Sequence, residues 1–119
     1  MQNLALCHYL DKNFATAKQT LDTLIEQNPD YKSPDGHLLY AKTLESLGET
    51  DQALREYQVV VDSFAGEEAR YRYGLLLKAN GKDHEASKIF HEILTRARNA
   101  PKYYRRAQKQ WIDLAKQHV

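Results

Sequence analysis

The sequence is poor in several residue types, and each shortage removes a class of protein from consideration. Its 119 residues include one cysteine, Cys7, so a disulfide within the chain is excluded. We expect Cys7 to be a buried structural thiol in a reducing, cytoplasmic environment. No apolar run approaches the roughly 20 residues that a membrane-spanning helix needs. Residues 1–7 also lack the basic start and the long apolar stretch of a signal peptide.

Sequence motifs for catalysis and metal binding are also missing. The chain has no glycine-rich phosphate loop, no nucleophile elbow and no His-Glu-x-x-His. The pairs His84-Glu85 and His91-Glu92 lie seven residues apart, which is about 10 Å along a helix and too far for one metal ion to bridge comfortably. We therefore interpret them as surface residues. We predict that the chain is not an enzyme and that it holds no metal and no cofactor.

The composition is that of a soluble globular protein, with 42% hydrophobic and 28% charged residues. The net charge of +1 is unevenly distributed. Residues 1–94 hold ten Lys/Arg against fifteen Asp/Glu, a net charge of −5. Residues 95–119 hold seven Lys/Arg against Asp113 alone, a net charge of +6. A mildly acidic body is therefore followed by a strongly basic end.

Five columns of residues recur along the chain at spacings of 36 and 33 residues. Two columns hold small residues and two hold large ones. The fifth column is a glycine at the end of the first predicted helix in the second and third repeats. A period in the low thirties with two helices per unit is typical of a helical solenoid. Small residues allow two helices to cross closely, and a glycine after a helix adopts the left-handed conformation without penalty. The columns are Ala5/Ala41/Gly74, Ala17/Ala53/Ala86, Leu21/Tyr57/Phe90, Leu24/Val60/Ile93 and Gly48/Gly81.

These columns resemble the tetratricopeptide repeat, whose pattern they follow over nearly the whole chain. The first unit also has Pro29 at the proline position that closes a repeat. The opening tryptophan of the family pattern is absent, and His37 and Arg70 stand in its place in the second and third units. The chain is therefore similar to a degenerate member of that family.

The resemblance implies an all-α, right-handed solenoid of about three helix-turn-helix units followed by a capping helix, in a single domain 1–119. We predict units at about 1–29, 34–65 and 67–99, and one capping helix over 101–117. Ser33 and Pro34 are suited to the N-cap and first position of the helix that opens the second unit. In the capping helix we expect Tyr104, Trp111 and Ala115 to pack on the last helix of the third unit.

The family places the first helix of each unit along a concave groove, and this implies the main functional hypothesis. We expect the chain to be a non-catalytic scaffold or adaptor that binds a peptide or a partner helix there, because Tyr and Trp dominate binding energy at protein interfaces. The Lys and Asn clamp that family members use for a C-terminal carboxylate is absent. The groove residues carried over from the family are Tyr9, Leu38, Lys42, Glu45, Tyr71, Leu75, Lys78, Tyr104, Gln108 and Trp111.

The basic end gives an alternative hypothesis, in which the region 96–116 binds nucleic acid or an anionic membrane. Cations interleaved with Tyr103 and Tyr104 suit a polyanion, whereas the sequence pI of about 7.9 is below the value above 9 expected of a nucleic-acid-binding domain. We therefore rank nucleic acid behind a protein partner. The residues of this basic patch are Arg96, Arg98, Lys102, Arg105, Arg106 and Lys109.

The first unit begins almost at residue 1, so Leu4, Leu6 and Leu10 would be poorly covered. Two alternatives stay open from the sequence. The chain is a segment of a longer repeat protein, with more repeats or a membrane anchor upstream, or a swapped or side-by-side homodimer covers these residues.

Overall fold

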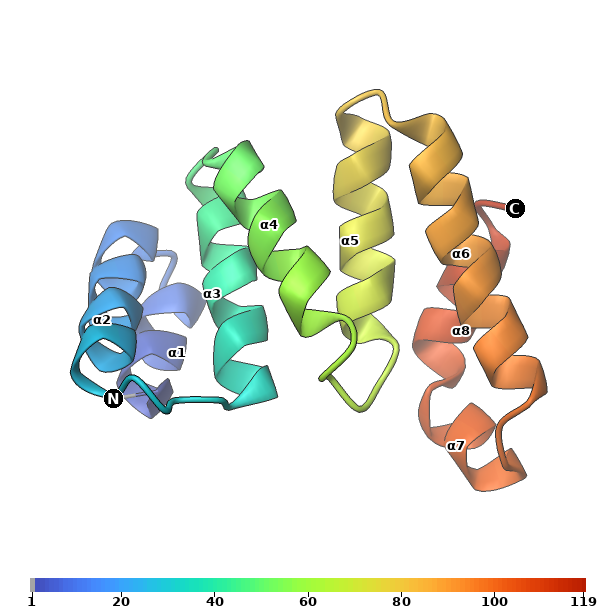
Figure 1. Cartoon of the computed structure of the whole chain (residues 1–119), viewed down its shortest axis with the longest axis horizontal. Helices are drawn as coiled ribbons and strands as arrows, with labels where there is room; N and C mark the ends of the chain where they lie inside the picture. Colours follow the sequence, from blue (N-terminus) through green and yellow to red (C-terminus); the bar gives the residue numbers. More distant parts are fainter. Residues whose placement is uncertain (1) are drawn as a thin grey trace. The chain divides into compact units, whose positions relative to one another are not determined.

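The computed structural model describes residues 2–119, and within them the chain forms eight α-helices and no strand (Figure 1). The first six helices form three pairs, and in each pair a short turn joins the two helices, as the repeat predicts. The helices are α1 Gln2–Leu10, α2 Phe14–Gln27, α3 Pro34–Ser46, α4 Thr50–Val60, α5 Glu68–Ala79, α6 Asp83–Arg98, α7 Lys102–Ala107 and α8 Lys109–Lys116.

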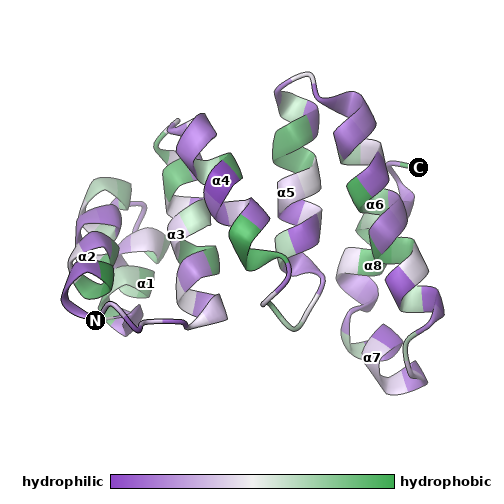
Figure 2. Cartoon of the chain, viewed as in Figure 1, coloured by the Kyte–Doolittle hydropathy of each residue, from purple (hydrophilic) through white to green (hydrophobic). Residues whose placement is uncertain are grey.

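The helices group into two compact units. Unit 1 spans residues 1–63 and holds α1 to α4, in which α1 packs on α2, α2 on α3 and α3 on α4. Unit 2 spans residues 64–119 and holds α5 to α8, in which α5 packs on α6 and α8 packs on both. The ribbons of α4 and α6 carry mixed hydrophilic and hydrophobic colours (Figure 2), as amphipathic helices do.

The turns within the helix pairs have the predicted chemistry. Gly48 and Gly81 take positive φ angles of 79° and 77°, and both follow the first helix of a pair. Lys12 occupies the same place after α1 with a φ of 61°, where a side chain costs about 1–2 kcal/mol. Before α3, the Ser33 hydroxyl accepts a hydrogen bond of 3.2 Å from the N–H of Gly36, and Pro34 begins the helix. Both features were predicted for this N-terminus.

The core consists of the small and large columns of the repeat. Ala5, Ala17, Ala41, Ala53 and Ala86 are at most 1% exposed, and so are the large side chains Leu21, Tyr57 and Phe90. At Gly74 even alanine would be crowded, because a Cβ there would lie 2.8 Å from the Phe90 ring. Helix pairs therefore pack closely at the columns that the sequence identified.

Two predictions about individual elements were wrong. Cys7 is exposed, because it lies on the side of α1 that no other described element covers. The predicted capping helix divides at Gln108 into α7 and α8, because the side chain of Gln108 turns into unit 2 and accepts a 3.0 Å hydrogen bond from the N–H of Glu67.

The packing of the capping helices on unit 2 also differs from expectation. Trp111 was expected to pack on α6, but its ring lies 5.9 Å from the ring of Tyr71 on α5. Tyr104 reaches Glu67 at the start of α5. Ile112 and Ala115 supply the buried side of α8. Thus α8 packs on α6, as expected, and in addition contacts α5 through Trp111.

Candidate functional site

The predicted groove residues fall on the first helix of each pair and on the capping helices, as the family pattern implies. Because the two units are separate compact bodies, the surface of each is considered by itself. Unit 1 contributes Tyr9, Leu38, Lys42 and Glu45, and unit 2 contributes Tyr71, Leu75, Lys78, Tyr104, Gln108 and Trp111.

In unit 1 an exposed surface joins α1 and α3. The ammonium group of Lys42 lies 5.3 Å from the centre of the Tyr9 ring, in a cation–π contact. Phe14 supports that ring edge-on at 5.4 Å. One helical turn before Tyr9, Leu6 is 41% exposed. The carboxylate of Glu45 accepts a 2.7 Å hydrogen bond from the Tyr57 hydroxyl. We call Leu6, Tyr9, Lys42 and Glu45 the α1–α3 surface.

Leu38 differs from the other predicted groove residues of unit 1. It is only 4% exposed and belongs to the core. The α1–α3 surface therefore combines one exposed leucine, one aromatic ring and charges of both signs.

In unit 2 the corresponding helix is covered by the C-terminal segment. Tyr71 is 8% exposed, and the rings of Phe90, Trp111 and His118 each lie 5.9 Å from its centre. The guanidinium of Arg72 lies 5.7 Å from the Trp111 ring. Of the α5 residues that were predicted to meet a partner, Tyr71 is thus covered by this chain's own α8 and His118, whereas Leu75 is half-buried and Lys78 is exposed.

His118 takes part in this cover and was missing from the predicted site. Its ring stacks on Phe90 at 4.6 Å with an interplanar angle of 14°. Its Nδ1 lies 3.2 Å from the ammonium nitrogen of Lys78. Burial and the nearby Lys78 charge lower the pKa of His118. No sequence signal marks this residue, because it lies after the last helix and outside the repeat pattern.

A buried carboxylate joins α5, α6 and α7. The Glu67 side chain has no exposed surface, and the Arg96 guanidinium donates to it at 3.2 Å. The Tyr104 hydroxyl also donates to Glu67, and burial together with this carboxylate raises the pKa of Tyr104. Gln108 completes the group through the backbone N–H of Glu67. We call Glu67, Arg96, Tyr104 and Gln108 the Glu67 cluster.

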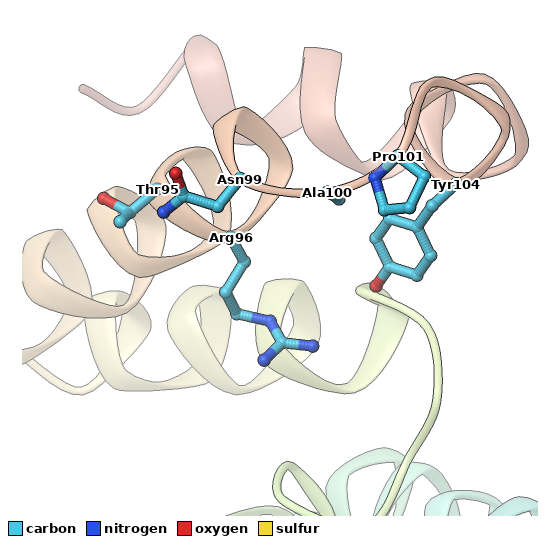
Figure 3. A pocket seen from close by; sticks show the side chains of 6 residues that line it. All are labelled: Thr95, Arg96, Asn99, Ala100, Pro101 and Tyr104. Carbon is cyan, nitrogen blue, oxygen red and sulfur yellow. The ribbon is translucent and has the colours of Figure 1, made fainter.

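The Glu67 cluster borders a pocket of about 380 Å³ at the end of α6 (Figure 3). Arg96 and Tyr104 extend from α6 and α7 toward α5, and the ring of Pro101 lies above Tyr104 (Figure 3). The Arg96 and Tyr104 side chains are held by their hydrogen bonds to Glu67, within unit 2. Two residues from the predicted partner-binding sets, Arg96 and Tyr104, therefore have a structural role here. The lining residues are Thr95, Arg96, Asn99, Ala100, Pro101 and Tyr104.

The rest of the predicted basic patch lies at the surface of unit 2. Arg98, Lys102, Arg105, Arg106 and Lys109 are all exposed, in contrast to the engaged Arg96. Lys116 joins them, since it lines two hollows together with Arg105. The sequence counted Lys116 in the charge of this end but did not assign it to the patch.

A polar network connects α2, α3 and α4 in unit 1. The Tyr40 hydroxyl donates to Asp22 at 2.5 Å and accepts from Gln52 at 3.2 Å. Burial and the Asp22 carboxylate raise the pKa of Tyr40. Close by, His37 Nδ1 lies 3.9 Å from Glu56, and burial raises the pKa of that carboxyl. These contacts hold the second helices of both pairs to α3.

Metal-binding residues do not gather anywhere in residues 2–119, where no group of three His, Cys, Asp or Glu side chains could hold an ion. His84, Glu85 and His91 are exposed, and Glu92 accepts a 2.9 Å bond from the nearly buried Arg70. Across the same residues no helix is long and apolar enough to cross a membrane.

Comparison with known families agrees with the columns and the helix pairs. A tetratricopeptide repeat profile matches residues 8–73, more than half of the chain, and a second profile of that family matches residues 68–100. The chain belongs to the tetratricopeptide repeat family. The resemblance drawn from the sequence is therefore confirmed. A comparison with curated protein sequences finds no match.

Solved structures share this tetratricopeptide repeat fold. PcrH, in complex with the chaperone binding region of PopB, matches with a TM-score of 0.82 and 17% identity, over 99% of this chain and 90% of that one. The CopN–Scc3 complex matches with a TM-score of 0.74 and 21% identity, over 95% of this chain and 65% of that one. At these identities the likeness establishes the all-α solenoid fold alone.

Proposed function

We propose that this tetratricopeptide repeat protein is a non-catalytic scaffold that binds a segment of a partner protein, and that unit 1 supplies the binding surface. The observation that carries the proposal is the α1–α3 surface. Leu6 is 41% exposed there, one helical turn from a Tyr9 ring that already stacks under Lys42. An exposed apolar side chain next to a fixed aromatic ring is the arrangement of an interface anchor.

Unit 2 supports the same assignment by contrast. At the groove position of Tyr71 on α5, Trp111 and His118 cover the ring, so a partner segment would have to displace them to reach it. In unit 1 the position equivalent to Tyr71 is the buried Leu38, but Leu6 and Glu45 are exposed and a partner segment can reach them without displacing any part of unit 1. A partner segment with an apolar side chain on Leu6 and Tyr9 fits this surface best.

The structural neighbour PcrH offers a precedent, because it was solved with a segment of another protein, the chaperone binding region of PopB. We propose that this chain likewise binds a segment of another protein. Extended segments and amphipathic helices both bind such grooves through a few apolar anchors.

Site-specific crosslinking tests the proposal. A photoreactive phenylalanine derivative is placed at Leu6 in one variant and at Val59 in another, since Val59 is 71% exposed on α4. Both sites are exposed and in unit 1, so neither change disturbs the core. We expect a protein from native lysate to be crosslinked at Leu6 and not at Val59, and mass spectrometry of the crosslink identifies the bound segment.

Binding of the identified segment is then measured with Tyr9→Ala and with Val59→Ala as the matched control. Loss of the aromatic anchor is expected to weaken binding about tenfold or more, whereas the control leaves it unchanged. Equal crosslinking at Leu6 and Val59, or equal binding by the two variants, would contradict the proposal.

A further inference from the structure

The basic end of unit 2 contains two adjacent hollows that share three lining residues. One hollow of about 290 Å³ lies between α6 and the capping helices. The other, of about 480 Å³, lies along α7 and α8. Arg105, Ile112 and Lys116 line both, so the hollows form one continuous surface. We call this surface the basic double pocket.

The floor and the rim of the basic double pocket differ in chemistry. Ala97 and Ile112 form part of the floor and are only 5% and 7% exposed, so the apolar surface is recessed. Leu94, from α6, adds to it. The rim is almost entirely cationic, and it consists of Arg98, Lys102, Arg105, Arg106, Lys109 and Lys116.

Most rim charges are not neutralised within the part of the chain that the structure describes. Arg98, Lys102, Arg105 and Arg106 form no ion pair with residues 2–119. Asp113 is the one carboxylate that lines the surface, and it lies 2.5 Å from Lys109 and 3.9 Å from Lys116. Those two lysines hold the pKa of the Asp113 carboxyl below its usual range. Unit 2 as a whole holds twelve Lys/Arg against six Asp/Glu, a net charge of +6.

We propose that the basic double pocket binds an acidic segment of a partner protein that carries at least two apolar side chains. The apolar side chains enter the hollows over Ile112 and Leu94. The Asp and Glu side chains pair with the rim, where Arg98 and Arg105 can each hold a carboxylate with two parallel hydrogen bonds. Hollows of about 290 and 480 Å³ each have room for an apolar side chain of such a segment.

The shape of the surface favours an acidic peptide over a membrane. An amphipathic membrane anchor inserts protruding apolar side chains below the lipid headgroups. Here the apolar residues lie beneath the cations, at 5–7% exposure for Ala97 and Ile112. A peptide side chain can reach this floor, whereas the acyl chains of a bilayer cannot.

The same surface is poorly suited to nucleic acid. Binding of single strands depends on aromatic side chains that stack with bases. No aromatic residue lines either hollow, and the strongly exposed Tyr103, at 76%, stands outside both. Phosphate contacts alone would bind weakly and would leave the apolar floor unused.

This inference stands apart from the proposed function, because the basic double pocket shares no residue with the α1–α3 surface. Each proposal can fail while the other holds.

A synthetic peptide tests the inference on the full chain. The probe is a fluorescein-labelled acidic peptide with two leucines one helical turn apart, and its affinity is measured by fluorescence anisotropy. One control peptide replaces the leucines with serine, and another replaces the acids with their amides. We expect each control to bind about tenfold more weakly or worse, because each removes one half of the recognition.

Variants of the protein locate the site. Lys102→Glu/Arg105→Glu reverses two unpaired rim charges and is expected to weaken peptide binding about tenfold or more. Lys32→Glu/Lys88→Glu makes the same change in net charge at two exposed lysines outside the surface, and we expect less than about a twofold effect there. In NMR spectra, the amide signals of Leu94, Ala97 and Ile112 should shift on addition of the peptide.

Four outcomes would overturn the proposal. The serine peptide binds as well as the leucine peptide, which would indicate a general polyanion surface. Phosphatidylserine vesicles or a single-stranded oligonucleotide bind more tightly than the peptide at equal salt and lose affinity in the same variant. The peptide fails to bind, or the two charge-reversal variants weaken it equally. Sedimentation shows a dimer that the rim variant alone dissociates, which would assign the surface to a second copy of this chain.

Discussion

Unit 1 and unit 2 are built on the same helix pair, yet the inner side of the first helix meets different surroundings in each. On α3, Lys42 and Glu45 remain at the surface with Tyr9 beside them. On α5, the residues at the matching offsets are Leu75 and Lys78, and the segment after the repeats turns back over this helix. The matching positions are buried to a similar degree in the two units, and what differs is the neighbour: Tyr9 of α1 lies beside Lys42 in unit 1, whereas the C-terminal His118 lies beside Lys78 in unit 2.

The second helices show the same contrast at the aromatic column. Tyr57 reaches across unit 1 and donates a hydrogen bond to Glu45. In unit 2 the matching residue is Phe90, which has no hydroxyl, and His118 stacks on its ring. The comparison teaches that the repeat decides which residues are buried, whereas the elements after it decide which remaining surface is available to a partner.

The largest expected effect on this comparison comes from Glu67→Ala. The change removes a fully buried carboxylate that Arg96 and Tyr104 contact. The polar contacts that join the start of α5 to α6 and α7 are lost with it. We expect the free energy of unfolding, measured by urea denaturation, to fall by about 2–3 kcal/mol, because Tyr104 and the 41% exposed Arg96 lose a buried charged acceptor. Glu68→Ala is the control, because Glu68 pairs with Arg72 four residues later in the same half-exposed stretch of α5, and its loss should cost about 1 kcal/mol or less. An equal loss in both variants would contradict the role of the Glu67 cluster.

Gly74→Ala should destabilise unit 2 by about 2 kcal/mol, even though alanine is the better helix former by about 1 kcal/mol. The new Cβ would lie 2.8 Å from Phe90, a ring that Tyr71 and His118 hold from other sides. Thermal unfolding measures the loss. The matching residue of unit 1 is already Ala41 and is fully buried. A stabilised Gly74→Ala variant would show that Phe90 moves freely.

Tyr40→Phe is the corresponding test of unit 1. It removes the hydroxyl that joins Asp22 on α2 to Gln52 on α4. The expected loss is about 1 kcal/mol, because the partly exposed Asp22 carboxylate loses a hydrogen-bond donor. Chemical denaturation measures the change. Tyr103→Phe serves as the control, since Tyr103 is 76% exposed and should show no change.

The smallest expected effect is a difference in pH response between the units. The pKa of His118 is lowered, so its contribution is fully present above its unfolded pKa of about 6.5 and is lost as the pH falls through the lower folded pKa. The pKa of Glu56 is raised, so its contribution is present at low pH and is lost as the pH rises through the folded pKa. Acidification should therefore loosen the end of unit 2 while unit 1 gains slightly.

Hydrogen exchange at about pH 7 and about pH 5, corrected for intrinsic rates, measures this difference in the amides of α4 and α8. The groups that face His118 are Lys78 and Tyr71, and those that influence Glu56 are His37, Arg55 and Asp22. In a His118→Gln variant the acid response of α8 should disappear. If it persists, another group is responsible.

Much of the fold could be predicted from the sequence because its signals are local or periodic. The glycines after α3 and α5, the Ser33 cap and the buried columns depend on residue type and spacing, and the structure has them as predicted. The break at Gln108 could not be predicted in this way, because its cause is a hydrogen bond to Glu67, 41 residues earlier. The exposure of Cys7 likewise depends on which elements surround α1.

The sequence by itself determined the repeat, the helix pairs, the core and the basic end, because each depends on composition and on a regular period. Tertiary structure alone decided that Arg96 is engaged by a buried carboxylate and that Lys116 joins the basic rim. It also decided that Tyr71 lies under the C-terminal segment. The physical reason is that access to a side chain depends on contacts between distant segments, and no local pattern in the sequence records them.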